Sequence, residues 1–263
     1  MRAGLKTLVF VLWLSHWLVP SSQAQDTLTF SMAQNAAPVA LAVRIVESAY
    51  DQLGISITKL PMARSRNILT ASSNEVDGII AGPNLFDQEF PFLTRIDVPI
   101  LQIDIRIFSC NPDLLDANSV KQKRWGRING ARLLSNYTEG YDDVWLGDTF
   151  QELFGMLKLD RLDAVVGPQI ALDIYSKRED RGCIEAVGGS LGQVDFFHYL
   201  RSKNGHLVPN VTRVLRDMLD TGKIKEITDA FFGPNAKKRP MPGELEETPD
   251  NPPSSDSATQ GFN

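Results

Sequence analysis

A small set of polar side chains follows short apolar segments early in the sequence, where a binding site for a charged small molecule can form. Arg64 comes shortly after the alternating segment 55–60. Its guanidinium offers a bidentate fork for a carboxylate or phosphate, although an arginine at the start of a helix can equally be exposed to solvent. Gln34, Asn35 and Asn84 also follow apolar segments, where such residues either bind a ligand or form turns.

A second group of candidates is the stretch Tyr137-Thr138-Glu139, which we expect to open a helix. The Thr138 hydroxyl and the first backbone N–H groups of such a helix can hold an anion, or Thr138 can simply cap the helix. Tyr137 and Met62 can pack against a ligand or belong to the core. The candidate ligand-binding residues are therefore Gln34, Asn35, Met62, Arg64, Asn84, Tyr137, Thr138 and Glu139.

Motifs for enzymatic chemistry are weak in this sequence. The segment Gly188-Gly-Ser-Leu-Gly192 matches G-x-S-x-G, but a nucleophile elbow needs a helix after the serine, and here the alternating segment 194–200 follows. We expect these glycines to form a turn. His198 and His206 lie too close to Ser190 for the catalytic triad of that fold, and no metal-binding, phosphate-loop or dinucleotide motif is present. We therefore expect no catalytic residue, no metal and no cofactor.

The elements that position the first group of candidates alternate between strand and helix. Residues 27–32, 55–60 and 76–81 have the pattern of strands, and residues 38–53 and 64–73 have helical spacing. Three strands separated by two helices with short connections predict a parallel sheet with right-handed crossovers. Polar residues that follow these strands then lie together at one edge of the sheet.

A second α/β unit is expected over residues 131–187. It has short predicted strands at 132–134 and 162–167, and a helix that begins near Asp148, which can act as its N-cap. The same alternation of strands and helices predicts a second lobe beside the first.

Two further alternating segments, 101–108 and 194–200, predict strands that cross between the two units. The stretch 110–130 is polar and rich in turn residues, so we expect loops there. Residues 207–231 have the spacing of two amphipathic helices.

The first 24 residues have the pattern of a secretory signal peptide. Arg2 and Lys6 precede the apolar run 8–18, and small residues allow cleavage after about Ala24. The alternative is an N-terminal membrane anchor, but the run is shorter than the roughly 20 residues that a spanning helix needs. We therefore expect a periplasmic protein, and we expect it to be a monomer.

Charge and cysteine content narrow the class of protein. Lys and Arg number 27 against 32 Asp and Glu, a net charge of −5, which argues against nucleic acid as a partner. The chain has two cysteines, Cys110 and Cys183. In an exported protein such a pair favours a disulfide over two buried free thiols.

Three segments stand out in this order along the chain: Glu75–Gly82 (EVDGIIAG), Leu159–Gly167 (LDRLDAVVG) and Leu219–Gly233. Together they resemble two strands and the closing helix of the extracellular solute-binding proteins of the amino-acid-binding type (bacterial family 3). The resemblance covers roughly residues 27–233. It implies a type II periplasmic-binding-protein-like fold, in which two α/β lobes joined by two hinge strands close on a small ligand.

The resemblance also implies the domain boundaries. Lobe 1 comprises residues 25–103 plus 197–233, and lobe 2 comprises residues 104–196. The signal peptide, residues 1–24, precedes them. The tail, residues 234–263, is rich in Pro and polar residues and is expected to be disordered.

The sequence departs from the family at the ligand clamp. Glu89 stands at about the position of the arginine that holds the ligand's α-carboxylate, and Pro168 stands where an aspartate often holds the α-amino group. Arg64 looks like the arginine of the "PWxRA" stretch of divergent members. The ligand class therefore stays open between an amino-acid-like molecule and another small carboxylate.

Function follows from the resemblance as an expectation. It implies capture of a small polar ligand for the membrane permease of an ABC transporter, or alternatively for a membrane receptor. Cyclohexadienyl dehydratases resemble the same proteins, and Glu89 or Glu139 facing the cleft could act as a general acid or base. We expect a binding protein without enzymatic activity.

Overall fold

The structure is a computed structural model that describes residues 27–84, 86–116 and 120–233. The expected signal peptide and C-terminal tail lie outside these residues. Within the described ranges, no helix is both long enough and apolar enough to cross a membrane.

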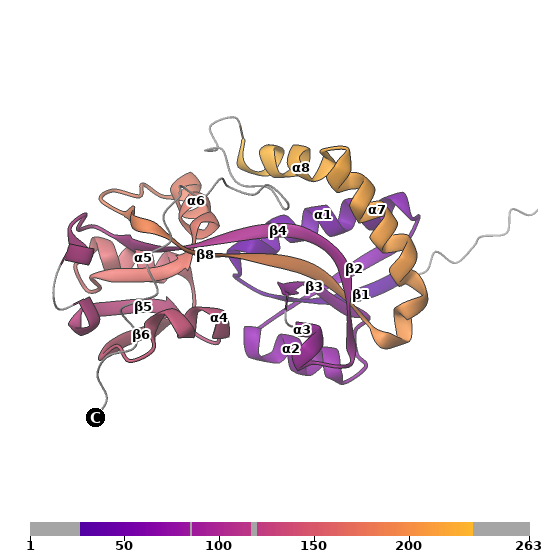
Figure 1. Ribbon diagram of the computed structural model, residues 1–263, viewed down its shortest axis with the longest axis horizontal. Helices are drawn as coiled ribbons and strands as arrows, with labels where there is room; N and C mark the ends of the chain where they lie inside the picture. The colour runs from indigo at the N-terminus through magenta and orange to yellow at the C-terminus, as the bar shows by residue number, and fades with distance from the viewer. Residues whose placement is uncertain (1–26, 85, 117–119, 234–263) are drawn as a thin grey trace, which may run out of the picture.

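Two α/β lobes lie side by side and share one eight-stranded sheet (Figure 1). The strand order is β2-β1-β3-β8-β4-β7-β5-β6, and each lobe contributes three parallel strands. Lobe 1 contains β1 (Thr27–Ala33), β2 (Ser56–Met62) and β3 (Gly78–Pro83), and lobe 2 contains β5 (Arg124–Ile128), β6 (Asp143–Gly147) and β7 (Ala164–Pro168). The expected two-lobed α/β architecture is confirmed.

Two long strands, β4 (Leu93–Ser109) and β8 (Glu185–Arg201), connect the lobes. Each has 17 residues, and they pair antiparallel from Leu93 opposite Arg201 to Ser109 opposite Glu185. Figure 1 shows both strands running from one lobe into the other. The crossing segments expected at 101–108 and 194–200 are parts of these longer strands.

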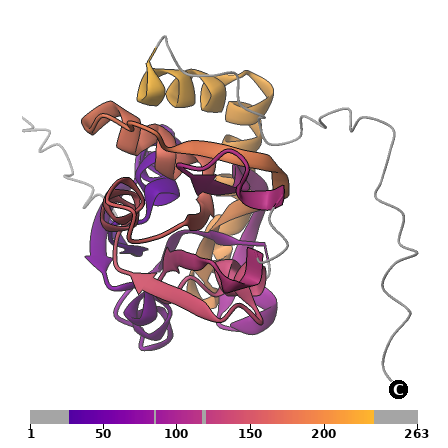
Figure 2. The same cartoon turned by 90° about the vertical axis from the view of Figure 1, so that its left-hand side faces the viewer.

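The helices lie around the sheet, with α7 and α8 along the outer side of lobe 1 (Figures 1 and 2). Lobe 1 carries α1 (Ala37–Gln52), α2 (Arg64–Ser72), α3 (Phe86–Glu89), α7 (Val208–Asp220) and α8 (Lys223–Phe232), and lobe 2 carries α4 (Arg132–Ser135), α5 (Phe150–Lys158) and α6 (Gln169–Arg178). Short 3-10 turns occur at Leu114–Asp116, Val120–Gln122, Asn136–Thr138 and Ser202–Leu207.

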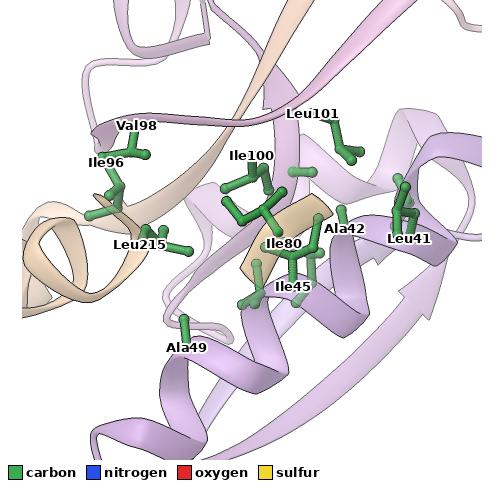
Figure 3. Close-up of a cluster of buried hydrophobic side chains, with 14 of the residues drawn as sticks. Leu41, Ala42, Ile45, Ala49, Ile80, Ile96, Val98, Ile100, Leu101 and Leu215 are labelled. Carbon is green, nitrogen blue, oxygen red and sulfur yellow. The ribbon is translucent and has the colours of Figure 1, made fainter. Parts of the chain in front are cut away.

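Each lobe has its own apolar core. In lobe 1 the apolar face of α1 repeats every three to four residues, as the helical spacing predicts. Figure 3 shows it packed against strand and helix side chains, with Leu41, Ala42, Ile45, Ala49, Ile80, Ile96, Val98, Ile100, Leu101 and Leu215 labelled. In lobe 2 a second cluster contains the buried Trp125, Phe108 and Phe154. On β4, Leu101 belongs to the first cluster and Ile103 to the second, so the two cores meet on this strand.

The two similar sequence segments around Asp77 and Asp163 have the same structural role in the two lobes. The Asp77 carboxylate accepts a hydrogen bond from the N–H of Thr29, and the Asp163 carboxylate accepts one from the N–H of Arg124, both at 2.8 Å. In return, the N–H of each aspartate donates to the carbonyl of the same partner residue. These aspartates therefore join parallel strands to each other.

The pKa values of both carboxyl groups reflect this bonding. Hydrogen bonds from the Arg124 side chain lower the pKa of Asp163, against the effect of burial. At Asp77 burial alone would raise the pKa, but hydrogen bonds from Thr29 and Lys203 outweigh it and lower the pKa. Both groups are charged at neutral pH as part of the fold.

The expectation of loops over 110–130 fails at residues 124–128, and the expectation of a strand at 132–134 is wrong. The strand of this region is β5, and residues 132–134 begin the short helix α4. In the sequence of β5 the fully buried Trp125 is flanked by Arg124, Gly126 and Arg127, so the segment lacks the apolar pattern typical of a strand. A Cβ on Gly126 would lie 2.6 Å from Cδ1 of Leu162, so a larger residue there would have to displace this buried side chain.

The start of α5 lies one residue later than predicted. The N-cap is Thr149, whose hydroxyl accepts the N–H of Glu152 at 3.1 Å, and not Asp148. The Glu152 carboxylate in turn accepts the N–H of Asp148 at 2.9 Å. This reciprocal arrangement is close to a capping box.

The glycine-rich segment expected to form a turn lies within β8. Ile105 of β4 pairs with Gly192, and Ile107 pairs with Val187, so residues 188–191 interrupt the ladder. Ser190 donates a hydrogen bond to the Asp104 carboxylate within this interruption. The serine is therefore held by β4, in a strand context that does not match a nucleophile elbow.

A disulfide joins Cys110 to Cys183, which confirms the predicted pair. Cys110 follows the last residue of β4, and Cys183 lies two residues before the start of β8. The bond therefore fixes the two connecting strands to each other at their ends in lobe 2.

Replacing both cysteines by serine should lower the free energy of unfolding by up to about 4 kcal/mol, because the disulfide closes a long loop in the unfolded chain. Urea unfolding of the double variant and of wild type, each with and without reductant, measures this effect. Reductant should destabilise wild type and leave the double variant unchanged. Equal stability of the two proteins would contradict the prediction.

His198 is completely buried in lobe 1. Its Nδ1 lies 3.1 Å from the carbonyl oxygen of Ile80, and its Nε2 lies 3.0 Å from the hydroxyl of Tyr50. Because a carbonyl only accepts, Nδ1 carries the proton and Nε2 accepts from Tyr50. Burial lowers the pKa of His198 to about 4, so the imidazole is neutral in the folded protein.

Stability should therefore fall as the pH decreases from about 6.5 towards about 4, because the unfolded chain binds a proton at His198 and the folded chain does not. From about pH 7.5 to about pH 5 this residue should account for a loss of about 2 kcal/mol. Urea unfolding at both pH values checks this. His198→Gln should reduce the pH dependence by that amount, whereas His206→Gln, at an exposed histidine, should retain it.

Candidate functional site

Five of the predicted ligand-binding residues lie at one edge of lobe 1. Strands β1, β2 and β3 end at Ala33, Met62 and Pro83, and because they are parallel their carboxyl ends share that edge. The N–H of Gln34 donates to the Met62 carbonyl at 2.8 Å, which joins the ends of β1 and β2. The structure therefore brings together Gln34, Asn35, Met62, Arg64 and Asn84.

Arg64 is the first residue of α2 and is partly buried. Its side chain makes no hydrogen bond or ion pair with another residue in the described part of the chain. Burial lowers the pKa of its guanidinium, which nevertheless stays charged. A partly buried charge without a partner is costly unless an anion pairs with it, so Arg64 is the strongest candidate for a ligand anchor.

Lobe 2 approaches Arg64 through Gly130. A Cβ placed on Gly130 would lie 3.7 Å from Cδ of Arg64, which puts the backbone of one lobe against the side chain of the other. Gly130 has a φ of +69°, in the left-handed region that favours glycine. It lies in the turn after β5, next to Asn129, whose N–H donates to the Gly147 carbonyl at 2.9 Å.

The sequence prediction did not include Gly130. The Asn-Gly dipeptide after a short strand is a turn signal, and it would have marked this position if β5 had been recognised.

A second contact across the lobes joins Glu89 and Arg132. Glu89 is the last residue of α3 in lobe 1, and Arg132 is the first residue of α4 in lobe 2. Their side chains form an ion pair. The Glu89 carboxylate is therefore paired with an arginine of the other lobe. Arg132 is a further residue at the meeting of the lobes that the sequence prediction did not include.

The lobe 2 candidates have different surroundings from those expected. The structure places a single 3-10 turn, Asn136–Thr138, after α4, and the helix expected to open at Tyr137 is absent. The Thr138 hydroxyl is buried, accepts a hydrogen bond from Nε of Arg127 at 3.2 Å and donates to the Ser135 carbonyl. Such bonds within lobe 2 leave this hydroxyl little capacity for a ligand.

Tyr137 and Glu139 flank this buried threonine. Tyr137 packs against the lobe 2 core and approaches Gly192, where a Cβ would lie 3.1 Å from the tyrosine hydroxyl. Glu139 is exposed, in extended backbone after the 3-10 turn.

The remaining lobe 1 candidates are exposed polar residues. Gln34 and Asn35 lie in the turn between β1 and α1, and Asn35 has a φ of +57°. The backbone carbonyl of Asn84 accepts a hydrogen bond from Arg95 at 2.9 Å, which fixes the start of the loop after β3. Their amide side chains can both donate and accept hydrogen bonds. In the described part of the chain, no cluster of three or more His, Cys, Asp or Glu residues could hold a metal ion.

Many solved structures share this fold. An ancestral arginine-binding protein bound to glutamine is 21% identical with a TM-score of 0.64, over 80% of this chain and 99% of its own. An amino-acid ABC transporter substrate-binding protein from Streptococcus pneumoniae, bound to L-arginine, is 12% identical with a TM-score of 0.64, over 78% and 94%. An ancestral amino-acid-binding protein, a precursor of cyclohexadienyl dehydratase, is 14% identical with a TM-score of 0.66, over 79% and 96%.

No protein-family model and no curated protein matches the sequence. The structural likeness shows that the chain has the type II periplasmic-binding-protein-like fold of amino-acid substrate-binding proteins, as the sequence resemblance implied. The low identities mark it as divergent from them.

Gly130→Ala should lower the free energy of unfolding by about 1 kcal/mol, because an L-residue in the left-handed region is strained. The control is Gly155→Ala in α5, where a Cβ meets nothing within 4 Å and the backbone is helical. That change should raise the free energy of unfolding by about 0.5–1 kcal/mol. Urea unfolding measures the free energy of unfolding of both variants. A change of the same sign in both would contradict the prediction that the left-handed backbone at Gly130 makes alanine unfavourable there.

Proposed function

We propose that the protein is an exported solute-binding protein that captures a small anionic ligand, an amino-acid-like molecule or another carboxylate, between its lobes. The single observation that carries this proposal is the guanidinium of Arg64. Arg64 is partly buried at the carboxyl edge of lobe 1, its guanidinium lacks a partner among the described residues, and the aliphatic part of its side chain lies against Gly130 of lobe 2.

The surroundings of Arg64 suit an anion. Arg64 begins α2, whose N-cap is Ala63 and whose first turn has no side-chain cap. Uncapped N–H groups and the positive end of the helix dipole favour a negative group at this place. A carboxylate bound to the guanidinium of Arg64 would also give this partly buried charge an ion-pair partner. Gln34, Asn35 and Asn84 would then contact the uncharged polar part of the ligand.

Capture would use the connection between the lobes. The lobes are joined by β4 and β8, and bending of these strands would move Gly130 towards or away from Arg64. The closed form would then dock a membrane transporter. This partner is proposed from the fold, because a structural neighbour is the substrate-binding protein of an amino-acid ABC transporter.

Two alternatives use the same cleft. A membrane receptor in place of a transporter would require the same ligand site. A dehydratase-like activity would need a free carboxyl group at the cleft, but Glu89 is paired with Arg132, and Glu139 is exposed after the 3-10 turn of lobe 2. These positions favour binding over catalysis.

The test compares Arg64→Gln with Arg66→Gln, because Arg66 is an exposed arginine on the same helix. A thermal-shift screen against amino acids, small carboxylates, phosphorylated metabolites, polyamines and sugars identifies the ligand, and calorimetry gives its Kd. Arg64→Gln should raise the Kd roughly 10- to 100-fold, the effect of one charged hydrogen-bonding partner. Arg66→Gln should leave the Kd unchanged, and neither variant should lower the Tm of the unliganded protein by more than a few degrees.

Equal affinity in the two variants would remove Arg64 from the site. Stabilisation by polyamines alone would overturn the proposal that the ligand is an anion.

A further inference from the structure

The lobes contact each other beyond β4 and β8 on two sides of their junction. On the side of α1 and α8, the α6 residues Ile170 and Ile174 pack against the lobe 1 core. The Lys177 ammonium of α6 also donates to the Phe231 carbonyl at the end of α8, at 2.6 Å. Figure 1 shows α6 near α1 and α8 at the top, and α4 facing α2 and α3 at the bottom.

The bottom side is held differently. There the ion pair of Glu89 and Arg132 joins α3 to α4, and the side chains remain 39% and 78% exposed. Arg132 lies two residues after Gly130, so the ion pair lies close to the contact between Gly130 and Arg64. One side of the junction thus has an apolar contact, and the other has a solvent-accessible ion pair.

An exposed ion pair has a modest and salt-dependent effect on the equilibrium between two conformations. Exposed ion pairs typically shift a two-state equilibrium by roughly 1.5- to 5-fold. A shift of this size matters little for folding, but it is considerable for an equilibrium between open and closed lobes that differ by a few kcal/mol or less. At about 0.5 M salt the screening length is only about 4 Å, which weakens the attraction.

We propose that Glu89 and Arg132 form an electrostatic latch that favours the closed arrangement of the lobes before any ligand binds. When the ion pair breaks, the lobes separate on the side of Glu89 and Arg132, and the α6–α8 side acts as the pivot. The ligand then meets a protein that already populates the closed state, and closure costs less of its binding free energy. The latch is independent of the identity of the ligand and is tested without one.

The experiment measures the distance between spin labels on the full exported chain, one at Ser72 of lobe 1 and one at Asp142 of lobe 2. Both positions are exposed, and labels on non-natural amino acids leave the native disulfide intact. Glu89→Gln and Arg132→Gln should each lower the ratio of closed to open molecules roughly 1.5- to 5-fold. The exchanged pair Glu89→Arg with Arg132→Glu should restore it.

Salt and a matched control complete the test. Raising the salt to about 0.5 M should lower the closed fraction of wild type but not that of Glu89→Gln. Glu75→Gln, which removes an exposed charge from lobe 1, should behave like wild type. Unchanged distances in both single variants, or an exchanged pair that does not restore the closed fraction, would overturn the latch. Neither result would bear on whether Arg64 binds a ligand.

Discussion

The antiparallel pairing of β4 with β8 is the constraint on which the rest of the molecule depends. Each strand belongs to both lobes, and β4 carries Leu101 in one core and Ile103 in the other. The parallel strands attach to this pair through β3 and β7, so the orientation of each lobe follows from its half of the two long strands. Any relative movement of the lobes must therefore bend a ladder of hydrogen bonds that is also part of both cores.

The charged side chains fall into two groups with different consequences. Asp77 and Asp163 each accept backbone and side-chain hydrogen bonds, and these bonds stabilise the sheet of their own lobe. Arg64 lacks such a partner in the described part of the chain, although it is partly buried. The paired aspartates therefore contribute to the architecture, whereas Arg64 is the charge with which the proposed ligand would pair.

The sequence predicted the elements whose side-chain pattern is regular. The helical spacing over 38–53 and the pairing of Cys110 with Cys183 are both found in the structure. It failed for β5, because Gly126 and two arginines conceal a strand whose burial depends on Leu162 and other distant residues. The ion pair of Glu89 with Arg132 was equally invisible, since its partners come together only when two lobes fold and meet.

The position of the disulfide has a consequence for how the chain can be cut. The bond lies where β4 ends and β8 is about to begin, so residues 110–183 form a covalent ring that holds most of lobe 2. A protease that cleaves one peptide bond inside this ring produces no free fragment, and the broken lobe stays attached to lobe 1 by way of both long strands. A single cut in lobe 2 therefore opens the chain but leaves both new ends connected to each other through Cys110 and Cys183.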